Sequence, residues 1–471
     1  MESRDVAPRS GELMGVARKR LTFALVVSLA VVTGCAVETP RNGFTLSAQQ
    51  GGNNLGPGTG IPGGPTGGTP TPGSLIAGGT QGPGGTGGTG GTSGGGDQGI
   101  GGGGGTGSNS SVGVTATTIT VSIIGSFSGV YGPPTNVAYR GMETWVEDVN
   151  QRGGIHGRKV IVKKVSNENS PEGGIAACKT VQSNGSFLAI SSGSTYYTSI
   201  DCLDKAGFPT VYSGGLRAIS GGWRNSYESA TSWDQGATSL PSLIRKQGDG
   251  GEKMGVLYIH DTAALEEAAK AFIARAKADG MNCCVVESAE PNAQSFTPQL
   301  LRLKNAQVKV VALSAILEAV GILRDAQAIN FEPQWASMYG LTLDIVSSVA
   351  RDLAAGAYWV RPYAAVDTPS FAAFNAKAEQ YGKGGPLPAE RFLFYANGLV
   401  LERVLLAAGA HPTRGTMIKG IESTKNFATG AFPTLTWAPG RNYGTNAVFP
   451  VICCRTSDWT WQSLGPPAEQ F

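Results

Sequence analysis

From residue 112 onward, short runs of β-branched and apolar residues alternate with segments in helical spacing, and this alternation constrains the fold more than any other feature. Residues 118–126 predict a strand, and residues 135–150 predict a helix because Val137, Gly141 and Trp145 fall on one helical face. The alternation continues with predicted strands at 159–166, 187–191 and 209–213 and with predicted helices at 171–182 and 196–205. Such a series predicts a mainly parallel sheet with helices on both faces.

A second series of the same kind begins after Ser232. It comprises predicted strands at 254–260, 283–288, 308–314 and 334–338, and predicted helices at 263–279, 297–306, 316–329 and 343–355. Residues 357–362 then indicate a strand or connector, and residues 389–408 a long helix. The predicted fold class is therefore α/β, with two doubly wound, Rossmann-like lobes. Because open parallel sheets bind ligands at the carboxyl ends of their strands, two facing sheets predict a ligand cleft between them.

The chain of 471 residues is long enough for two sizeable cores, but its N-terminal quarter cannot supply one. The 70 glycines fall heavily at residues 51–107. Residues 36–111 are Gly/Thr/Pro/Ser-rich and cannot bury enough apolar surface to offset chain entropy, so we expect a disordered tether. As a Gly-rich coil it would span roughly 45 Å.

The first 35 residues resemble an export signal. Three basic residues at 18–20 precede an apolar run at 21–32 and the small residues before Cys35. The run is shorter than the roughly 20 residues that span a bilayer, so a permanent transmembrane helix is disfavoured. The segment Val-Thr-Gly-Cys also resembles the lipobox of bacterial lipoproteins, which implies lipid attachment at Cys35. A simple secreted protein is the alternative, and translation could begin at Met1 or Met14.

The charge pattern and the histidines argue against two function classes. The formal net charge is only +3, and no concentrated basic segment follows the signal, which disfavours a nucleic-acid partner. The chain has three histidines, His156, His260 and His411, and the two predicted lobes contain no G-x-S-x-G elbow, so a nucleophile with its base is not evident. We therefore expect no enzyme, although a pair of carboxylates in a cleft would escape this test.

Several motifs, in order, resemble one family. They are GSFSGVYG at 125–132, NQRGGIHGR at 150–158, SPE at 170–172, AGFPT at 206–210 and FYANG at 394–398. Together they are similar to type I periplasmic binding proteins, and the closest subgroup is the leucine/isoleucine/valine-binding family of ABC importers. The resemblance covers nearly all of residues 115–460. It implies two lobes joined by a hinge of crossing strands, the first at 112–233 and 361–437 and the second at 234–360 and 438–465.

Six cysteines follow Cys35, an even number that favours disulfides in an exported chain. Cys178 and Cys202 lie on successive predicted helices, in a region that the resembled family often bridges. Two adjacent pairs remain, Cys283 with Cys284 and Cys453 with Cys454. Neighbouring residues of a strand face opposite sides, and the implied topology puts both pairs in the second lobe, so we expect bridging between the pairs with the connectivity open. Metal ligation is disfavoured because no spaced Cys or His ligands accompany them.

Three loops of the first lobe should contact the ligand. Each follows a predicted strand, and helix N-terminal N–H groups beside hydroxyls suit a carboxylate or other anionic oxygen. The resembled family holds the polar end of its ligand in these loops. The candidate residues are Ser128, Tyr131, Ser192, Ser194, Thr195, Ser213 and Gly214.

The second lobe gives weaker signals. The Tyr-Gly pair that the resembled family commonly shows is missing from residues 261–265, which weakens the inference of the same amino-acid ligand. Other aromatic candidates are Tyr131, Tyr196, Tyr212 and Tyr339. Asp261 or Asp344 could hold a primary amine.

These observations predict an extracytoplasmic solute-binding lipoprotein without cofactor, metal or catalysis, monomeric and anchored through Cys35 in the periplasm or at the cell surface. It would capture a small polar ligand, an amino acid or a related carboxylate or amide, and deliver it to the membrane permease of an ABC importer. Branched-chain amino acids lead by resemblance. Two alternatives stay open: a tethered sensor of the same fold that feeds a signalling partner, and a hydrolase acting in the cleft.

Overall fold

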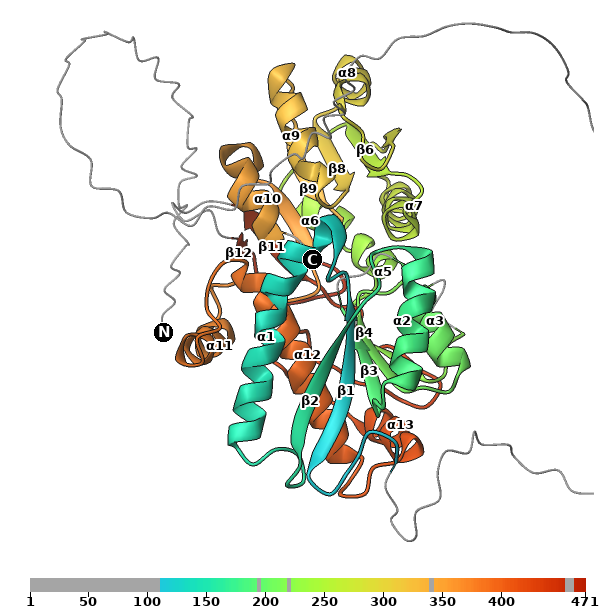
Figure 1. The fold of residues 1–471 in the computed structure, drawn as a ribbon. Helices are drawn as coiled ribbons and strands as arrows, with labels where there is room; N and C mark the ends of the chain where they lie inside the picture. Colours follow the sequence, from blue (N-terminus) through green and yellow to red (C-terminus); the bar gives the residue numbers. More distant parts are fainter. Residues whose placement is uncertain (1–110, 193–195, 218–221, 339–342, 454–460) are drawn as a thin grey trace, which may run out of the picture. The chain divides into compact units, whose positions relative to one another are not determined.

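The computed structural model describes residues 111–192, 196–217, 222–338, 343–453 and 461–471. They form two α/β lobes, each built on its own sheet (Figure 1). The expected positions Cys35, Ser194, Thr195, Tyr339 and Cys454 lie outside the described residues. Within the described part, no helix has the length and apolar character needed to cross a membrane.

The first sheet has five parallel strands in the order β2-β1-β3-β4-β5. Their bounds are β1 Thr118–Gly125, β2 Lys159–Ser166, β3 Leu188–Ser191, β4 Thr210–Ser213 and β5 Ser226–Ala230. The 3-10 turn η1 (Gly129–Tyr131) and helices α1 (Gly132–Gln151), α2 (Pro171–Ser183) and α3 (Thr198–Lys205) connect the strands. The sheet is covered on both faces, because Ile123 packs in one core cluster and its neighbour Ile124 in another.

The helices begin where the sequence supplies start signals. Ser170 accepts a hydrogen bond from the Gly173 N–H at 3.0 Å, and Pro171 occupies the first turn of α2. α1 likewise begins at two prolines, Pro133 and Pro134. These starts aim the N-termini of the helices at the carboxyl ends of the strands. That edge of the sheet is where a parallel α/β fold places its ligand.

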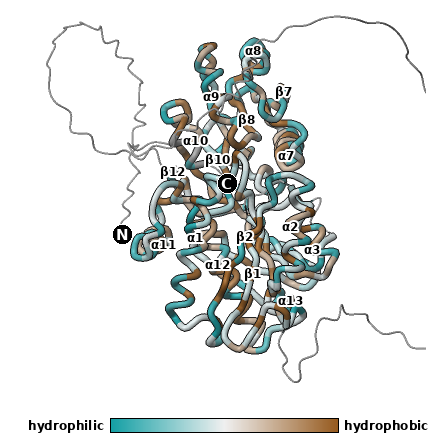
Figure 2. Tube along the Cα trace, in the orientation of Figure 1, coloured by the Kyte–Doolittle hydropathy of each residue, from teal (hydrophilic) through white to brown (hydrophobic). Residues whose placement is uncertain are grey.

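The second sheet has seven strands in the order β12-β11-β10-β9-β8-β6-β7. Their bounds are β6 Met254–Ile259, β7 Val285–Ala289, β8 Val310–Ser314, β9 Gln334–Ser337, β10 Tyr358–Arg361, β11 Phe449–Cys453 and β12 Trp461–Ser463. The helices between them are α7 Ala263–Ala278, α8 Thr297–Asn305, α9 Glu318–Ala328 and α10 Leu343–Ala350, with the 3-10 turn η2 Arg351–Ala354. β11 runs antiparallel to β10 and β12, while the other pairs are parallel. Apolar residues follow β8 and β1 through the middle of each sheet (Figure 2).

The chain passes between the lobes three times. After β5 it enters the second lobe through α5 (Trp233–Ala237) and α6 (Leu240–Lys246). After β10 it returns to form α11 (Pro369–Gln380), α12 (Pro388–Ala407) and α13 (Arg414–Ser423), and α12 packs along α1 of the first lobe. The third passage leads to β11, and on the way Tyr443 pairs with Glu228 at the edge of β5. The crossing segments expected for this fold are therefore present, while the expected lobe boundaries stay a prediction.

The close approach of α1 and α12 depends on glycine. A Cβ atom on Gly141 of α1 would lie 1.7 Å from the Arg391 carbonyl oxygen of α12. One on Gly398 of α12 would lie 2.3 Å from the Trp145 ring. The two helices pack tightly because neither position carries a side chain.

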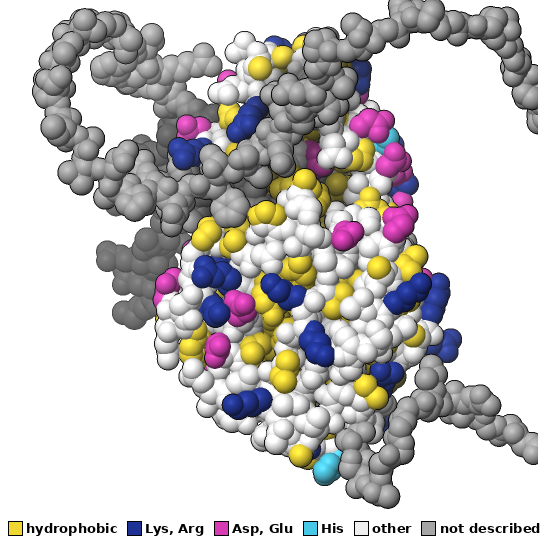
Figure 3. Space-filling model, in the orientation of Figure 1, with side chains coloured by type: hydrophobic (Ala, Val, Ile, Leu, Met, Phe, Trp, Pro, Cys, Tyr) yellow, Lys and Arg dark blue, Asp and Glu magenta, His cyan; other side chains and the backbone are white. Residues whose placement is uncertain are grey.

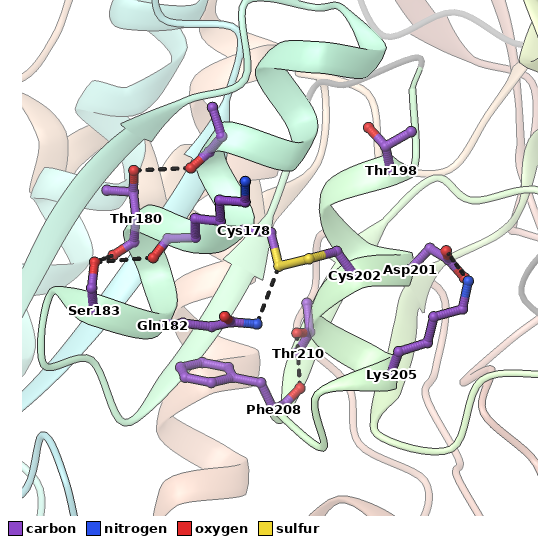
Figure 4. Close-up of a disulfide and its surroundings, with 12 residues drawn as sticks. Cys178, Thr180, Gln182, Ser183, Thr198, Asp201, Cys202, Lys205, Phe208 and Thr210 are labelled. Carbon is purple, nitrogen blue, oxygen red and sulfur yellow. Dashed lines mark hydrogen bonds and ion pairs between the residues drawn. A yellow bond between two sulfur atoms is a disulfide. The ribbon is translucent and has the colours of Figure 1, made fainter. Parts of the chain in front are cut away.

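A disulfide joins α2 to α3. Cys178 and Cys202 are bonded at 2.05 Å, and their Cα atoms lie 6.1 Å apart (Figure 4). Cys178 is fully buried, and its sulfur accepts a hydrogen bond from the Gln182 side chain at 3.4 Å. The pairing implied by the family resemblance is confirmed.

The expected bridge between the two adjacent cysteine pairs does not form. Cys283 is bonded to its neighbour Cys284. These residues precede β7 at one edge of the second sheet, whereas Cys453 ends β11 near the other edge, with β10, β9, β8 and β6 between them. At about 4.8 Å per strand, that separation exceeds the reach of a disulfide several times over. The prediction was wrong because local periodicity gives no strand order.

Candidate functional site

A cavity of about 200 Å³ lies between the two lobes at the carboxyl ends of their strands. The first lobe contributes Ser128, Val130, Tyr131, Glu168, Asn169 and Tyr196. The second contributes Thr262, Leu265, Pro291, Asn292, Ile316 and Glu318. Both lobes thus supply walls, so a molecule held there would contact each of them.

The first-lobe wall consists of segments that follow β1, β2 and β3. Ser128 and Tyr131 belong to the turn after β1, and the Ser128 hydroxyl lies 2.8 Å from that of Ser166 at the end of β2. Glu168 and Asn169 come two and three residues after β2, with positive φ angles of 53° and 49°. The left-handed backbone turns the chain sharply toward α2 and leaves these side chains at the cavity.

The second-lobe wall repeats the arrangement. Thr262 precedes α7, Asn292 follows β7, and Glu318 begins α9 directly after β8. The Glu318 carboxylate accepts a hydrogen bond from the Ile316 N–H at 3.2 Å, which fixes its position at the start of the helix. Both sheets therefore present their strand ends to the same space.

The cavity is acidic. Glu168 and Glu318 face it from opposite lobes, and the lining within the described residues contains no Lys or Arg. Burial, together with the nearby Glu318 and Tyr196, raises the pKa of Tyr131, so its hydroxyl stays protonated and can donate. In Figure 3, acidic side chains gather on the upper right of the molecule, at about the height of α7 in Figure 1. The site suits a ligand that carries a positive group.

Three expected ligand contacts lie outside the lining of this cavity. Ser192 and Ser213 are buried, with their hydroxyls 3.2 Å apart, and both receive hydrogen bonds at 3.4 Å from the side-chain amide of Asn397 on α12. Neither lines the cavity. The carbonyl of Gly214 accepts a hydrogen bond from the Trp233 indole at 3.2 Å. These three residues connect the first sheet to its covering elements, and their contact with a ligand stays a prediction.

Asp261 lies beside the cavity rather than in its lining. Its carboxylate is 3.0 Å from Nδ1 of His260, and the Glu290 carboxylate is 2.7 Å from Nε2 of the same ring. These two hydrogen bonds raise the pKa of His260. Among the described residues, this is the group whose nitrogen and oxygen atoms could surround a metal ion. Since both ring nitrogens are already hydrogen-bonded, the cluster is explained as an ionic pairing of exposed side chains.

The remaining candidates separate into two groups. Asp344 contacts Glu390 of α12 and does not line the cavity. Tyr212 is buried and packs edge-on against Trp223 at 5.3 Å between ring centroids. By contrast, Tyr196 faces the cavity as expected.

The sequence analysis missed Glu168, Asn169, Asn292 and Glu318. All four stand just after a strand or at the start of the following helix, so the rule that selected the loops after β1, β3 and β4 would have found them if applied to every strand end. The serines drew attention because they are frequent in ligand loops, whereas acidic loop residues are usually solvated.

A larger cavity of about 310 Å³ lies on the first lobe between α1, α11 and α12. Four of its charged side chains pair with one another: Arg152 with Glu402 at 2.9 Å, and both Arg152 and Lys377 with Asp148, at 3.2 and 2.8 Å. It lies away from the strand ends. These ion pairs join three helices, and we assign the cavity no ligand.

The passage between the lobes contains a buried carboxyl group. Glu228 of β5 is fully buried, accepts the Gly215 N–H at 2.9 Å and pairs with the Arg217 guanidinium at 3.2 Å. Arg217 stacks on the ring of Tyr443, 3.6 Å from its centroid, in the third crossing segment. Burial raises the pKa of Glu228 to about 7, although Arg217 opposes the shift. This group therefore changes charge near neutral pH where the lobes are joined.

Comparison with known proteins agrees with this geometry. A family model described as periplasmic binding protein matches residues 118–451. A Leu/Ile/Val-binding protein homolog of Brucella melitensis is 25% identical over 341 residues, covering 68% of this chain and 87% of the relative.

Two solved structures share the fold. A fatty acid ABC transporter substrate-binding protein from Thermomonospora curvata has a TM-score of 0.67 at 17% identity, covering 76% of this chain and 94% of that one. A solute-binding protein from R. palustris in complex with benzoate has a TM-score of 0.62 at 17% identity, covering 74% and 97%.

Proposed function

Because the chain belongs to the periplasmic binding protein family, we propose that it captures a small amine-bearing ligand between its lobes and delivers it to the permease of an ABC importer. The family implies a substrate-binding protein outside the cytoplasm rather than an enzyme. The observation that carries the proposal is the cavity whose walls come from strand ends of both sheets. A ligand that contacts both walls favours the closed arrangement by its differential affinity.

The acidic lining narrows the class of ligand that we propose. Glu168 and Glu318 would hold an ammonium group, and Tyr131 and Tyr196 offer aromatic faces and hydroxyls to the rest of the molecule. The N-termini of α7 and α9 at the second-lobe wall provide N–H groups for a carboxylate. An amino acid or its amide fits this combination. The relatives' names span branched-chain amino acids, fatty acids and benzoate, so they do not fix the ligand.

The proposed contacts include residues that face the cavity and residues that do not. Ser128 and Tyr131 face it. Ser194, Thr195 and Tyr339 stay in the proposal as contacts, as does Asp261 at its edge. For Ser192 and Ser213 we propose a supporting role, since their hydroxyls hold the loops of β3 and β4 against Asn397.

We further propose that lipid at Cys35 anchors the protein and that residues 36–111 form its tether. The support is the sequence pattern alone: a basic segment, a short apolar run and a lipobox-like cysteine followed by a Gly-rich spacer. Such a tether would let the lobes reach a permease in the same membrane.

A thermal-shift screen of the full chain tests the ligand assignment. We expect amino acids and their amides to raise the unfolding temperature, equivalent to about 2.7 kcal/mol at a hundredfold excess over Kd. Glu318→Gln should weaken a hit by about tenfold or more, because the ammonium group loses a charged partner. Glu147→Gln, at an exposed position of α1, makes the same charge change and should leave affinity unchanged. Equal binding by the Glu318 variant would remove that residue from the site, and binding only of uncharged or anionic compounds would overturn the ligand class.

A further inference from the structure

Helices α10 and α12 belong to different lobes but begin beside each other. α10 lies between β9 and β10 of the second sheet, whereas α12 packs along α1 of the first lobe. Each carries an acidic residue in its first turn, Asp344 in α10 and Glu390 in α12. Two carboxyl groups thus meet across the boundary between the lobes, away from the ligand cavity.

The two helix starts are joined by reciprocal hydrogen bonds. The Asp344 N–H donates to Oε1 of Glu390 at 3.2 Å, and the Ala389 N–H donates to Oδ2 of Asp344 at 2.8 Å. These bonds bring the two carboxyl groups together, and Oε2 of Glu390 is buried with no hydrogen-bond donor among the described residues. Each side chain therefore satisfies an N–H group in the first turn of the other lobe's helix, where intrahelical partners are lacking. This contact exists only while the lobes hold their present arrangement.

The burial and the close approach of the two carboxyl groups favour a proton on the pair. Two carboxylates have only acceptor oxygens, so a hydrogen bond between them forms only when one is protonated. Glu390 is 4% exposed, and burial together with Asp344 raises its pKa well above the ordinary value. The close approach of the two carboxyl groups and the burial of Glu390 both favour one shared proton.

The charged groups around the pair are engaged elsewhere. Arg361, at the end of β10, is fully buried and donates from Nε to the Tyr363 carbonyl at 2.8 Å and from Nη2 to the Ala364 carbonyl. Tyr363 is also buried, and burial with the nearby Glu390 raises its pKa, so it stays neutral.

Arg391 neighbours Glu390 along α12 but is directed away from it. Its guanidinium donates to three backbone carbonyls, those of Lys383, Gly385 and Pro386. Glu379 of α11 and Arg140 of α1 act on the charge of Arg391, and burial lowers its pKa. These hydrogen bonds of the Arg361 and Arg391 guanidinium groups therefore go to backbone carbonyls rather than to the two carboxyl groups.

We propose that Asp344 and Glu390 form a proton-dependent latch that stabilises this arrangement of the lobes at acidic pH and releases it as the pH rises. When the helices separate, both side chains reach water, which favours their ionised forms. The joined state then binds one proton more than the separated state. Over the pH range in which Glu390 is protonated in the joined state and ionised in the separated state, the ratio of joined to separated molecules falls by up to about tenfold for each pH unit.

The test is the distance between the lobes as a function of pH. Donor and acceptor dyes are attached through non-cysteine amino acids introduced at Asn305 of α8 and Lys419 of α13, both exposed, which leaves every cysteine unchanged. Energy transfer in the full chain without ligand is measured between pH 5 and pH 8. We expect the wild-type signal to shift with pH as the latch opens.

Two amide variants test whether Asp344 and Glu390 cause the change of energy transfer with pH. Glu390→Gln and Asp344→Asn each place a permanent N–H donor between the side chains, so the signal at pH 8 should match that at pH 5. Glu147→Gln is the matched control and should keep the wild-type response. The proposal is overturned if the wild-type signal is constant over this range, or if both amide variants respond to pH as the wild type does. Because no ligand is involved, either outcome leaves the proposed function untouched.

Discussion

Glu228 gives the clearest prediction at the scale of a single residue. Its pKa of about 7 in the folded chain, against an ordinary 4.5, means that folding retains a proton which the unfolded chain releases. The stabilisation is fully present below about pH 4.5 and is lost as the pH rises through 7. The free energy of unfolding should therefore fall over this window by about 3 kcal/mol, and Glu228→Gln should remove that part of the slope.

Urea unfolding of both proteins at a series of pH values, followed by tryptophan fluorescence, gives the difference between the two slopes. Gln keeps an oxygen for the Gly215 N–H, so the variant should fold. Glu147→Gln should follow the wild-type curve because that side chain is exposed. If the free energy of unfolding depends on pH in the same way for wild type and Glu228→Gln, Glu228 is ionised in the folded chain over the whole pH range and the prediction is wrong.

The contacts that each candidate side chain makes were the hardest feature to predict from the sequence. Ser192 and Ser213 stand at strand ends as expected, but their hydroxyls face Asn397, a residue of α12 that lies 184 positions or more away. No local pattern reveals that partner. Ser128 and Tyr131 could be predicted because the turn after β1 lies at the strand end that faces the cavity.

Among the elements, the pair α1 and α12 offers a sharp test of packing. Gly141→Ala would force a methyl group into the Arg391 carbonyl, so the helices would have to move apart. We expect a loss of about 3 kcal/mol in the free energy of unfolding, at the upper end of overpacking effects. Gly415→Ala on α13 is the matched control, since its new Cβ would lie 3.8 Å from the Thr413 hydroxyl. That change should be neutral or should stabilise by up to about 1 kcal/mol. Equal stability of the two variants would mean that α1 and α12 shift at little cost.

The elements that periodicity predicted are those with buried, apolar faces, such as β1, β6 and α7. β5 was missed because its sequence, Ser-Tyr-Glu-Ser-Ala, is mostly polar although all five residues are buried. One of its polar side chains bonds to the neighbouring strand: the Ser229 hydroxyl donates to the Tyr212 carbonyl at 3.0 Å. β12, with three residues, is too short to show a period. The order of the strands in the second sheet could not be predicted from the sequence either. For that reason the expected bridge between the two cysteine pairs was wrong.

For the whole molecule, the acidic cavity makes a prediction about salt. Glu168 and Glu318 face one space from opposite lobes, so closing the lobes without ligand brings like charges together. Raising the ionic strength from about 10 mM to about 1 M shortens the screening length from about 30 Å to about 3 Å and reduces this repulsion. At constant pH, energy transfer between dyes at Asn305 and Lys419 should therefore shift toward a shorter distance in high salt.

Glu318→Gln removes one of the two charges and should make the distance in low salt resemble that of the wild type in high salt. An added ammonium ligand should have the same effect on the wild type, because it supplies the missing positive charge within the cavity. A salt response that is unchanged in Glu318→Gln would locate the repulsion elsewhere between the lobes. In that case, the cavity carboxylates would not control closure, and ligand charge would matter for affinity alone.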